Sequence, residues 1–309
     1  MAEKNIVNKN SEILFLYDAK MCNPNGDMDD ENKPRMDKET DINLVSDVRL
    51  KRYVRDYLKI FEGKPIYVDD DALDGKTKLK QMKKDGVKED DLIDIRLFGA
   101  VLPKENKKKS DKKESEKKES EDNTDEERGI TGPIQFTWGY SLNKTEMLES
   151  KTITSKWSGQ GGIGKDFRIK YSLLAFSGFV NSKTAQSNKE KGLTIEDLHL
   201  FEKALLRSIP LMSTRSKYGQ YPRFYLRVEL KDDKKSLKDL REYVFIKKRE
   251  NISSIDEVEL GLSKLVDYLK ESKDLVGKIF WWADDKLSTI NGKLEDVGLP
   301  MEELNVWKD

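Results

Sequence analysis

Four cationic side chains fall within seven residues of one another near the start of the chain: Arg49, Lys51, Arg52 and Arg55. Asp47 and Asp56 flank this run, but no acid interrupts it. A charge run of this kind is usually the solvated face of an ordinary helix. Cations without interleaved acids can also neutralise the phosphates of a nucleic acid. From this stretch alone, both interpretations stay open.

A glycine-rich segment further along the chain matches two phosphate-binding patterns. Gly159, Gly161 and Gly164 satisfy G-x-G-x-x-G, and the phosphate-loop pattern fails only where Asp166 replaces the required Ser or Thr. Both patterns also need a helix directly after the glycines, whereas Phe167 begins a run typical of a strand. We therefore expect a mobile hairpin tip. Around it stand cations and an indole that suit single-stranded nucleic acid: Lys156, Trp157, Lys165 and Arg168.

Four acids follow the first apolar run and form a possible metal site: Asp27, Asp29, Asp30 and Glu31. The glycine and the final glutamate of a calcium-binding helix–loop–helix are missing at the required offsets. A solvated loop is the favoured interpretation. The single cysteine, Cys22, excludes an internal disulfide and a thiolate cluster, and the single histidine, His199, excludes a multi-histidine site. We expect no cofactor.

The overall charge balance limits any nucleic-acid function. The 309 residues include 58 Lys and Arg and 58 Asp and Glu, so the formal net charge is +0. Phosphate binding therefore requires cations segregated onto one face. No apolar run approaches the length of a membrane span, and the N-terminal residues lack a signal peptide's apolar segment. These features predict a cytoplasmic protein without a membrane partner.

The first elements form a strand, a loop and a helix. The apolar run 13–17 predicts a buried strand, and the Pro and Gly of residues 23–27 predict a loop. Residues 43–61 predict an amphipathic helix, which places the four cations on the surface outside its apolar stripe. That stripe consists of Leu50, Val54, Tyr57, Leu58 and Phe61.

Later runs predict the remaining elements. Alternation over 134–140 predicts a strand with an aromatic face, and further strands are predicted over 169–180, 224–230 and 278–282. One helix is predicted to begin at Thr194, with Asp197 completing a capping box. Ser254 and Glu257 suggest a second capping box and helix.

The order of the main elements, β-α-β-β-α-β, predicts an α+β, ferredoxin-like fold, which is also the frame of RNA-recognition motifs. The standard aromatic signature of those motifs is absent from residues 169–180. Residues 62–128 interrupt the pattern as an insertion. Within it, residues 104–128 contain no large apolar side chain and are predicted to be disordered.

The chain resembles a known family in several segments. These are LYDAK at 16–20, NPNGD at 23–27, NLVSDVRLKRYVR at 43–55, ITGPIQ at 130–135 and GLTIEDL at 192–198. Together they look like the Cas seven (RAMP superfamily) backbone subunit of type I CRISPR Cascade effector complexes, closest to the type I-B branch. The resemblance covers most of the chain except the charged insert and the tail.

The resemblance implies an architecture and a set of partners. Residues 1–61 with 129–309 would form a modified RNA-recognition-motif palm, 62–128 a finger, and a hairpin at about 142–169 a thumb. Neighbouring copies would polymerise along one CRISPR RNA, alongside other Cascade subunits. The guide would then pair with target DNA.

The basic run and the resemblance together give a set of predicted RNA-binding residues. They are Asn23, Asn25, Ser46, Arg49, Lys51, Arg52, Arg55, Gln135, Lys156, Trp157, Lys165, Arg168, Arg215 and Lys217. Type I members of the family are not nucleases, so no enzyme is expected. Related type III subunits cleave RNA with an Asp in the loop after the first strand. Asp27 therefore keeps a metal-dependent endoribonuclease as the alternative.

Overall fold

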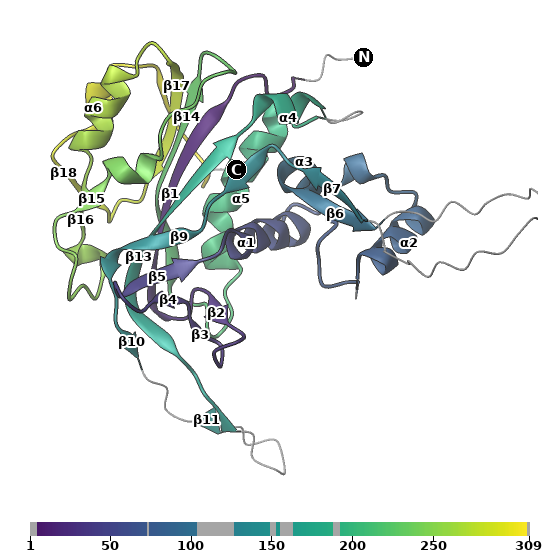
Figure 1. Ribbon diagram of the computed structural model, residues 1–309, viewed down its shortest axis with the longest axis horizontal. Helices are drawn as coiled ribbons and strands as arrows, with labels where there is room; N and C mark the ends of the chain where they lie inside the picture. The colour runs from purple at the N-terminus through teal and green to yellow at the C-terminus, as the bar shows by residue number, and fades with distance from the viewer. Residues whose placement is uncertain are drawn as a thin grey trace, which may run out of the picture.

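The computed structural model describes residues 5–72, 74–103, 127–148, 153–154, 163–187 and 192–307. Its centre is one large mixed sheet, shown in Figure 1. The sheet order is β19 (Met301–Glu303), β17 (Val276–Ala283), β14 (Gln220–Leu230), β1 (Ser11–Cys22), β13 (Arg168–Val180), β9 (Gly139–Lys144), β5 (Ile42–Val45) and β4 (Met36–Asp37). Two short strands, β8 (Ile134–Phe136) and β10 (Met147–Leu148), also pair with β13. The predicted α+β class is confirmed.

The long strand β1 is buried on both faces. Phe15 and Tyr17 contribute to the core on one side of the sheet, and Leu14 and Leu16 contribute to the core on the other. Such a two-sided apolar strand can only lie in the middle of a sheet between covering layers. The strand predicted from residues 13–17 is confirmed and extends further at both ends.

Different parts of the chain cover the two faces. The helices α1 (Asp47–Ile60) and α5 (Ile195–Leu211) pack on one face with α3 (Ile93–Phe98) and α4 (Ser182–Ser187). Residues 231–275 and 284–299, on either side of the sheet strand β17, cover the other face (Figure 1). They include α6 (Ser263–Glu271) and a small sheet of β15 (Phe245–Ile246), β16 (Glu259–Gly261) and β18 (Ser288–Ile290).

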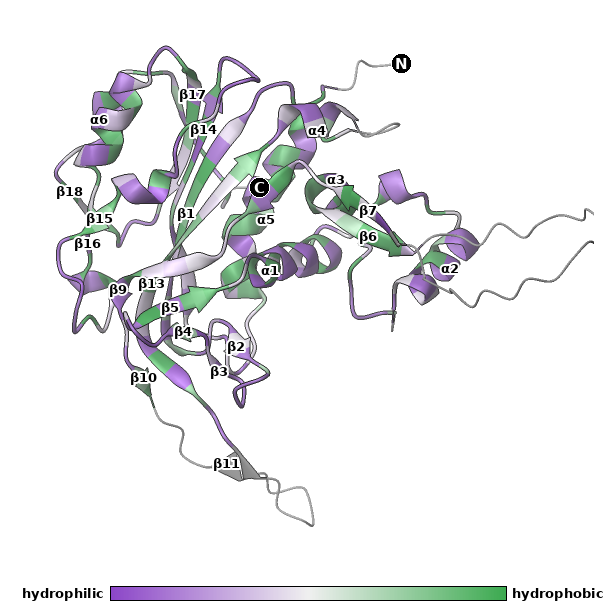
Figure 2. Ribbon diagram, in the orientation of Figure 1, coloured by the Kyte–Doolittle hydropathy of each residue, from purple (hydrophilic) through white to green (hydrophobic). Residues whose placement is uncertain are grey.

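The insertion has a small core of its own. It contains α2 (Gly75–Asp85), which is mostly hydrophilic (Figure 2), and a ribbon of β6 (Gly99–Pro103) with β7 (Glu127–Thr131). Tyr67, Met82 and Leu102 are among its buried side chains. The disorder prediction is wrong at residues 127–128, because these begin β7, and residues 104–126 lie outside the described residues. The ribbon also crosses the predicted boundary at residue 128.

The first helix begins later than its sequence suggested. Residues Ile42–Val45 form the strand β5, and the helix starts at Asp47 after Ser46, whose side chain accepts a hydrogen bond from the Arg49 backbone N–H. Cross-strand pairing with β9 is a tertiary interaction that overrides the helical periodicity. Leu50, Val54, Tyr57 and Leu58 are buried as predicted, whereas Phe61 caps the helix and is exposed.

The aromatic strand predicted over 134–140 is interrupted. Phe136 pairs with Gly178 and Tyr140 with Ala175, so one side carries one more residue than the other. An extra residue of this kind moves the following side chains to the opposite face. Phe136 accordingly joins the core beneath α1 and α5, while Tyr140 packs against the core on the other side.

The helix predicted from Ser254 is also corrected. Residues Ile255–Glu257 form only a 3-10 turn, β16 follows, and the helix α6 begins at Ser263. The predicted capping box at Thr194 and Asp197 is confirmed at the start of α5. The strands predicted over 169–180, 224–230 and 278–282 are present, and Cys22 is buried.

The remaining short elements are β2 (Gly26–Asp27), β3 (Lys33–Pro34), β11 (Ile153–Thr154), β12 (Ile163–Gly164) and the 3-10 turns Glu89–Asp91, Leu240–Tyr243 and Leu294–Val297. In the described ranges, every helix is too short or too polar to traverse a lipid bilayer.

Candidate nucleic-acid interface

The loop after β1 is tied directly to the start of α1. Asn25 Oδ1 accepts hydrogen bonds from the backbone N–H of Ser46 at 2.8 Å and from its hydroxyl at 2.9 Å. Ser46 Oγ in turn accepts from the Arg49 N–H at 3.3 Å. Because both side chains act on the helix N-terminus, the loop and the first helical turn form one rigid unit that places Arg49.

A second loop, residues 212–219, docks onto the same place. The Asn23 backbone N–H donates to the Ser216 carbonyl at 2.8 Å, and Lys217 Nζ donates to the Asn23 carbonyl at 2.6 Å. Asn23 Nδ2 donates to the Asn32 carbonyl at 2.7 Å, while its Oδ1 is buried without a partner. Asn23 therefore brings Lys217 next to the N-terminus of α1.

Arg49 and Lys217 form a pair of cations that no described carboxylate neutralises. Among the described residues, neither side chain takes part in an ion pair, and Arg49 Nε is buried without a partner. Burial and, to a smaller extent, the Arg49 charge lower the pKa of Lys217 to about 8. We call these two residues the cation pair. Two like charges held close together at a helix N-terminus favour a bound anion.

Tyr53 supports this pair, and the sequence interpretation missed it. The Arg49 guanidinium lies 3.9 Å from the centre of the Tyr53 ring. The Tyr53 hydroxyl accepts from Gln220 Nε2 at 3.1 Å, and Gln220 Nε2 also donates to the Lys217 carbonyl at 2.7 Å. The four-residue spacing between Arg49 and Tyr53 was the available signal, since such residues are neighbours on a helix.

Two other predicted cations of α1 are paired with acids. Lys51 Nζ lies 3.0 Å from Asp47 Oδ2. Arg52 Nε lies 2.6 Å from Asp56 Oδ1, and its Nη2 pairs with Asp70. The flanking acids noted in the sequence thus neutralise part of the basic run, because residues four apart on a helix lie side by side.

Arg55 is buried, so its predicted place on the helix surface is wrong. Its Nε donates to Asp94 Oδ2 at 3.1 Å, and Asp94 also accepts from the backbone N–H groups of Tyr67 and Val68 at 2.8 and 3.1 Å. Burial lowers the pKa of Arg55, against the opposing effect of Asp94. This ion pair fastens the insertion to α1.

Gln135 joins α1 to the strand that follows the insertion. Its Oε1 accepts from Lys51 Nζ at 3.0 Å, and its Nε2 donates to the carbonyls of Gly132 and Phe98 at 2.9 and 3.2 Å. These contacts use both ends of the amide, so Gln135 acts here as a connector that orients Lys51.

The described residues at the root of the predicted thumb also cluster near this site. Arg168 donates to Asp166 at 2.7 and 3.0 Å and to the Met21 carbonyl at 3.0 Å. Arg215 is exposed and lies 3.6 Å from Asp166. Lys165 pairs with Glu31 at 2.6 Å. Lys156, Trp157 and most of the glycine motif lie outside the described residues.

Three of the four acids in the acidic loop form separate ion pairs. Asp27 lies 3.1 Å from Arg35, Asp30 pairs with Lys33, and Glu31 pairs with Lys165. Within the described part of the chain, no three potential metal ligands come together as a site. These three carboxylates favour the solvated-loop interpretation because cations already occupy them.

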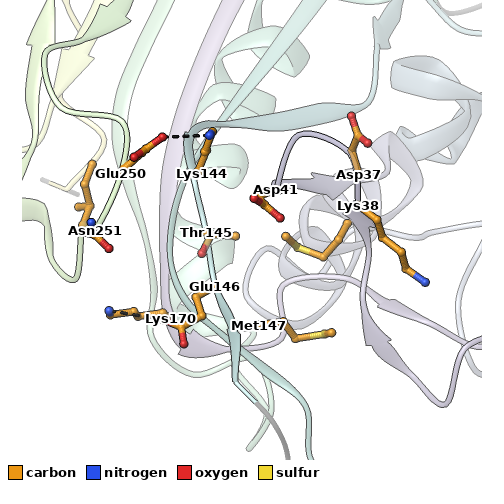
Figure 3. A pocket seen from close by; sticks show the side chains of 12 residues that line it. Asp37, Lys38, Asp41, Lys144, Thr145, Glu146, Met147, Lys170, Glu250 and Asn251 are labelled. Atoms are coloured by element: carbon orange, nitrogen blue, oxygen red, sulfur yellow. Dashed lines mark ion pairs between the residues drawn. The ribbon is translucent and has the colours of Figure 1, made fainter.

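A hollow of about 500 Å³ lies beside β10 and the start of β13 (Figure 3). Its charges are mixed, with Lys144 and Glu250 paired at 2.9 Å and Lys170 and Glu146 at 3.6 Å. None of the predicted RNA-binding residues lines it. Four carboxylates and three ammonium groups line the hollow. A hollow with more carboxylates than ammonium groups does not attract a polyanion, so the cation pair remains the better candidate.

Comparison with known proteins shows which family this chain belongs to. The model of the family "CRISPR-associated protein Cas7" matches residues 9–263. A CRISPR-associated protein Cas7 from Haloferax volcanii is 33% identical over 304 residues, covering 90% of this chain and 87% of the relative.

Solved structures share the fold. A chain of a CRISPR RNA-guided surveillance complex matches with a TM-score of 0.52 and 13% identity, covering 94% of this chain and 97% of that chain. A second, from such a complex in a pre-nicking state, matches with a TM-score of 0.50 and 11% identity, covering 94% and 98%. On the family match and the Haloferax relative, the chain belongs to the Cas7 family of CRISPR-associated proteins.

Proposed function

We propose that this chain binds CRISPR RNA without reading its sequence and that successive copies line up along the RNA as the backbone of a type I surveillance complex. The observation that carries the proposal is the cation pair, Arg49 and Lys217, which lies at the N-terminus of α1 without a described carboxylate partner. Backbone phosphates fit such a site because they are anionic and identical in every nucleotide. The guide held in this way would pair with target DNA.

The topology supports a modified RNA-recognition-motif palm. The strands run in the order β14, β1, β13, β9, and α1 and α5 cover one face. This is the arrangement of a split βαβ fold. Residues 231–275 and 284–299 cover the other face, over which an RNA-recognition motif stacks its bases. RNA would therefore run along the edge near the cation pair. We propose the finger at 62–128 and the thumb at about 142–169.

We further propose that the chain is not an enzyme and acts with other Cascade subunits. Asp27, Asp30 and Glu31 of its acidic loop are held in ion pairs, which leaves a catalytic metal without a prepared site among the described residues. The remaining predicted RNA-binding residues and the type I-B assignment stay predictions.

The proposal is tested by reconstituting the full chain with RNAs of increasing length. The expected result is a ladder of complexes in which each added copy occupies an equal length of RNA, whatever its sequence, and the RNA stays intact with Mg²⁺ or Mn²⁺. One copy per RNA at every length would contradict the backbone role. Specific cleavage abolished by Asp27→Ala would establish the ribonuclease instead.

The low pKa of Lys217 predicts that RNA binding weakens as pH rises. Below its pKa of about 8, Lys217 is charged and attracts phosphate; above it, the charge is lost. Affinity should fall by up to about tenfold per pH unit between the pKa values of the free and the bound protein. An oligoadenylate is the appropriate ligand, because adenine does not titrate in this interval. Fluorescence anisotropy from pH 6.5 to 9.5 measures the change.

Lys217→Arg is the matched control for this pH dependence. Arginine stays charged throughout the interval, so the variant should show a flat profile. The folding stability of the free wild-type protein should change in the opposite direction to its RNA affinity, rising as the pH rises. Its unfolded chain holds a proton on Lys217 that the folded chain releases between about pH 8 and 10.5, so stability gains with pH there. Identical binding profiles for wild type and Lys217→Arg would contradict the assignment.

A further inference from the structure

Two exposed tyrosines follow Lys217 of the cation pair closely in the chain. Tyr218 follows Lys217 in the chain and is 68% exposed, and Tyr221 is 40% exposed. Burial and, next, the Tyr218 hydroxyl raise the pKa of Tyr221. We propose that Tyr218 and Tyr221 form a stacking surface for an unpaired nucleobase of the bound RNA. This inference rests on the proposed RNA-binding function and adds a contact to a base where the cation pair contacts phosphate.

The backbone between the two tyrosines is fixed. Gly219 has φ +103°, and its carbonyl accepts a hydrogen bond from the Lys20 N–H at 2.8 Å. A Cβ atom at this position would lie 2.5 Å from the Lys20 carbonyl oxygen. Only glycine combines this positive φ with so close an approach to β1. The turn therefore holds Tyr218 and Tyr221 in a set relation to each other and to the sheet.

Buried charges support Tyr221 from below. The Arg223 guanidinium lies 5.5 Å from the centre of the Tyr221 ring. Asp18 binds Arg223 at 2.9 Å and Asp284 binds it at 2.5 Å, while the Tyr171 hydroxyl donates to Asp18 at 3.2 Å. Asp18 and Arg223 are both nearly inaccessible. A side chain supported in this way is preorganised and loses little freedom when a ligand stacks on it.

Tyr221 of this stacking surface lies on the face of the sheet opposite α1 and α5. Tyr221 pairs with Asp18 of β1, two residues beyond Leu16, so it stands on the face that residues 231–275 and 284–299 cover further along. At this end of β14 the cover stops, and the ring reaches solvent. An RNA-recognition motif stacks bases on the corresponding face. Here the stacking residues would come from β14 and its preceding turn, and not from β13, in which the standard aromatic signature is absent.

The charges around the tyrosines favour RNA over a protein partner. Lys20 and Arg215 are exposed, and the Lys20 backbone N–H is bound to the Gly219 carbonyl between the two tyrosines. Lys217 of the cation pair directly precedes Tyr218. The nearby Asp284 is already bound by Arg223. Exposed aromatic rings bordered by cations are the composition of surfaces that bind single-stranded nucleic acid, where rings take bases and cations take the backbone.

The test compares an oligoadenylate with an abasic ribose-phosphate oligomer of the same length, using the full chain. Tyr221→Leu and Tyr218→Leu should weaken binding of the oligoadenylate by roughly fivefold to a hundredfold, the range of one lost base stack. Both variants should bind the abasic oligomer as wild type does. Tyr221→Phe keeps the ring and should retain most of the affinity. Tyr243→Leu, a partly exposed tyrosine of the C-terminal layer, is the matched control and should change neither.

A spectroscopic measurement adds a direct readout of stacking. A 2-aminopurine in the RNA should be quenched on binding to wild type and to Tyr221→Phe, and less so on binding to Tyr221→Leu. Equal losses on both oligomers, unchanged quenching, or altered self-association without RNA would each overturn the stacking surface. Failure of the underlying function looks different, because wild type would then bind neither oligomer.

Discussion

Replacing both Arg49 and Lys217 with Met should weaken binding of a short RNA by about 25-fold at 0.1 M salt. Each phosphate contact on a single strand contributes about 0.7 to the slope of log affinity against log salt. Losing two contacts should therefore lower that slope by about 1.4, which corresponds to the stated loss at this salt concentration. The loss should be equal for unrelated sequences, because phosphates carry no sequence information. Anisotropy titrations at several salt concentrations measure both quantities.

A matched control separates direct contact from net charge. Replacing Lys51 and Arg52 with Met removes the same number of charges from the same region, but Asp47, Asp56 and Asp70 already neutralise those two side chains. We expect an affinity loss of no more than about threefold, since paired cations displace fewer counterions from the RNA. If both double variants lose affinity equally, RNA binding depends only on the overall charge of the protein. The assignment of the cation pair as a phosphate site would then be wrong.

Asp94→Ala should destabilise the protein by about 3–5 kcal/mol, the usual cost of removing one partner of a buried ion pair. Its side chain is 0% exposed and accepts from Arg55 and from the backbone N–H groups of Tyr67 and Val68. The substitution leaves the buried Arg55 charge and both N–H groups without their acceptor. Urea titration followed by circular dichroism measures the change in the free energy of unfolding.

Two variants test the cause of that loss. Asp70→Ala removes another acid paired with a cation of α1, but its side chain is 80% exposed, so its melting temperature should match wild type. The double variant Arg55→Met/Asp94→Leu leaves no charge buried and should recover part of the lost stability. A double variant less stable than Asp94→Ala would show that the isolated Arg55 charge is not the source of the destabilisation.

Local patterns in the sequence were sufficient to predict the main elements. Alternation and apolar stripes depend only on residues within a few positions of one another. The central strand, β13, β14 and the helix α5 with its Thr194–Asp197 capping box follow from them. The order of these elements predicted the α+β class, and quoted segments such as residues 43–55 predicted the family.

The ends of helices and strands that depend on pairing with distant strands could not be predicted from short stretches of the sequence. Residues Ile42–Val45 continue a helical pattern yet form β5, because β9 offers them hydrogen bonds. The extra residue between β8 and β9 can be recognised only from the pairing of both strands with β13. It sends Phe136 and Tyr140 to opposite faces of the sheet.

The tertiary structure also decided which predicted cations are available. By composition Arg49, Lys51, Arg52 and Arg55 are alike, and the sequence by itself determined only that cations are concentrated on this helix. Folding brings Asp94 to Arg55 and Lys217 to Arg49. How strongly a charged side chain attracts phosphate depends on its distance from neighbouring charges and on its exposure to water. Parts of the chain that are far apart in sequence set both.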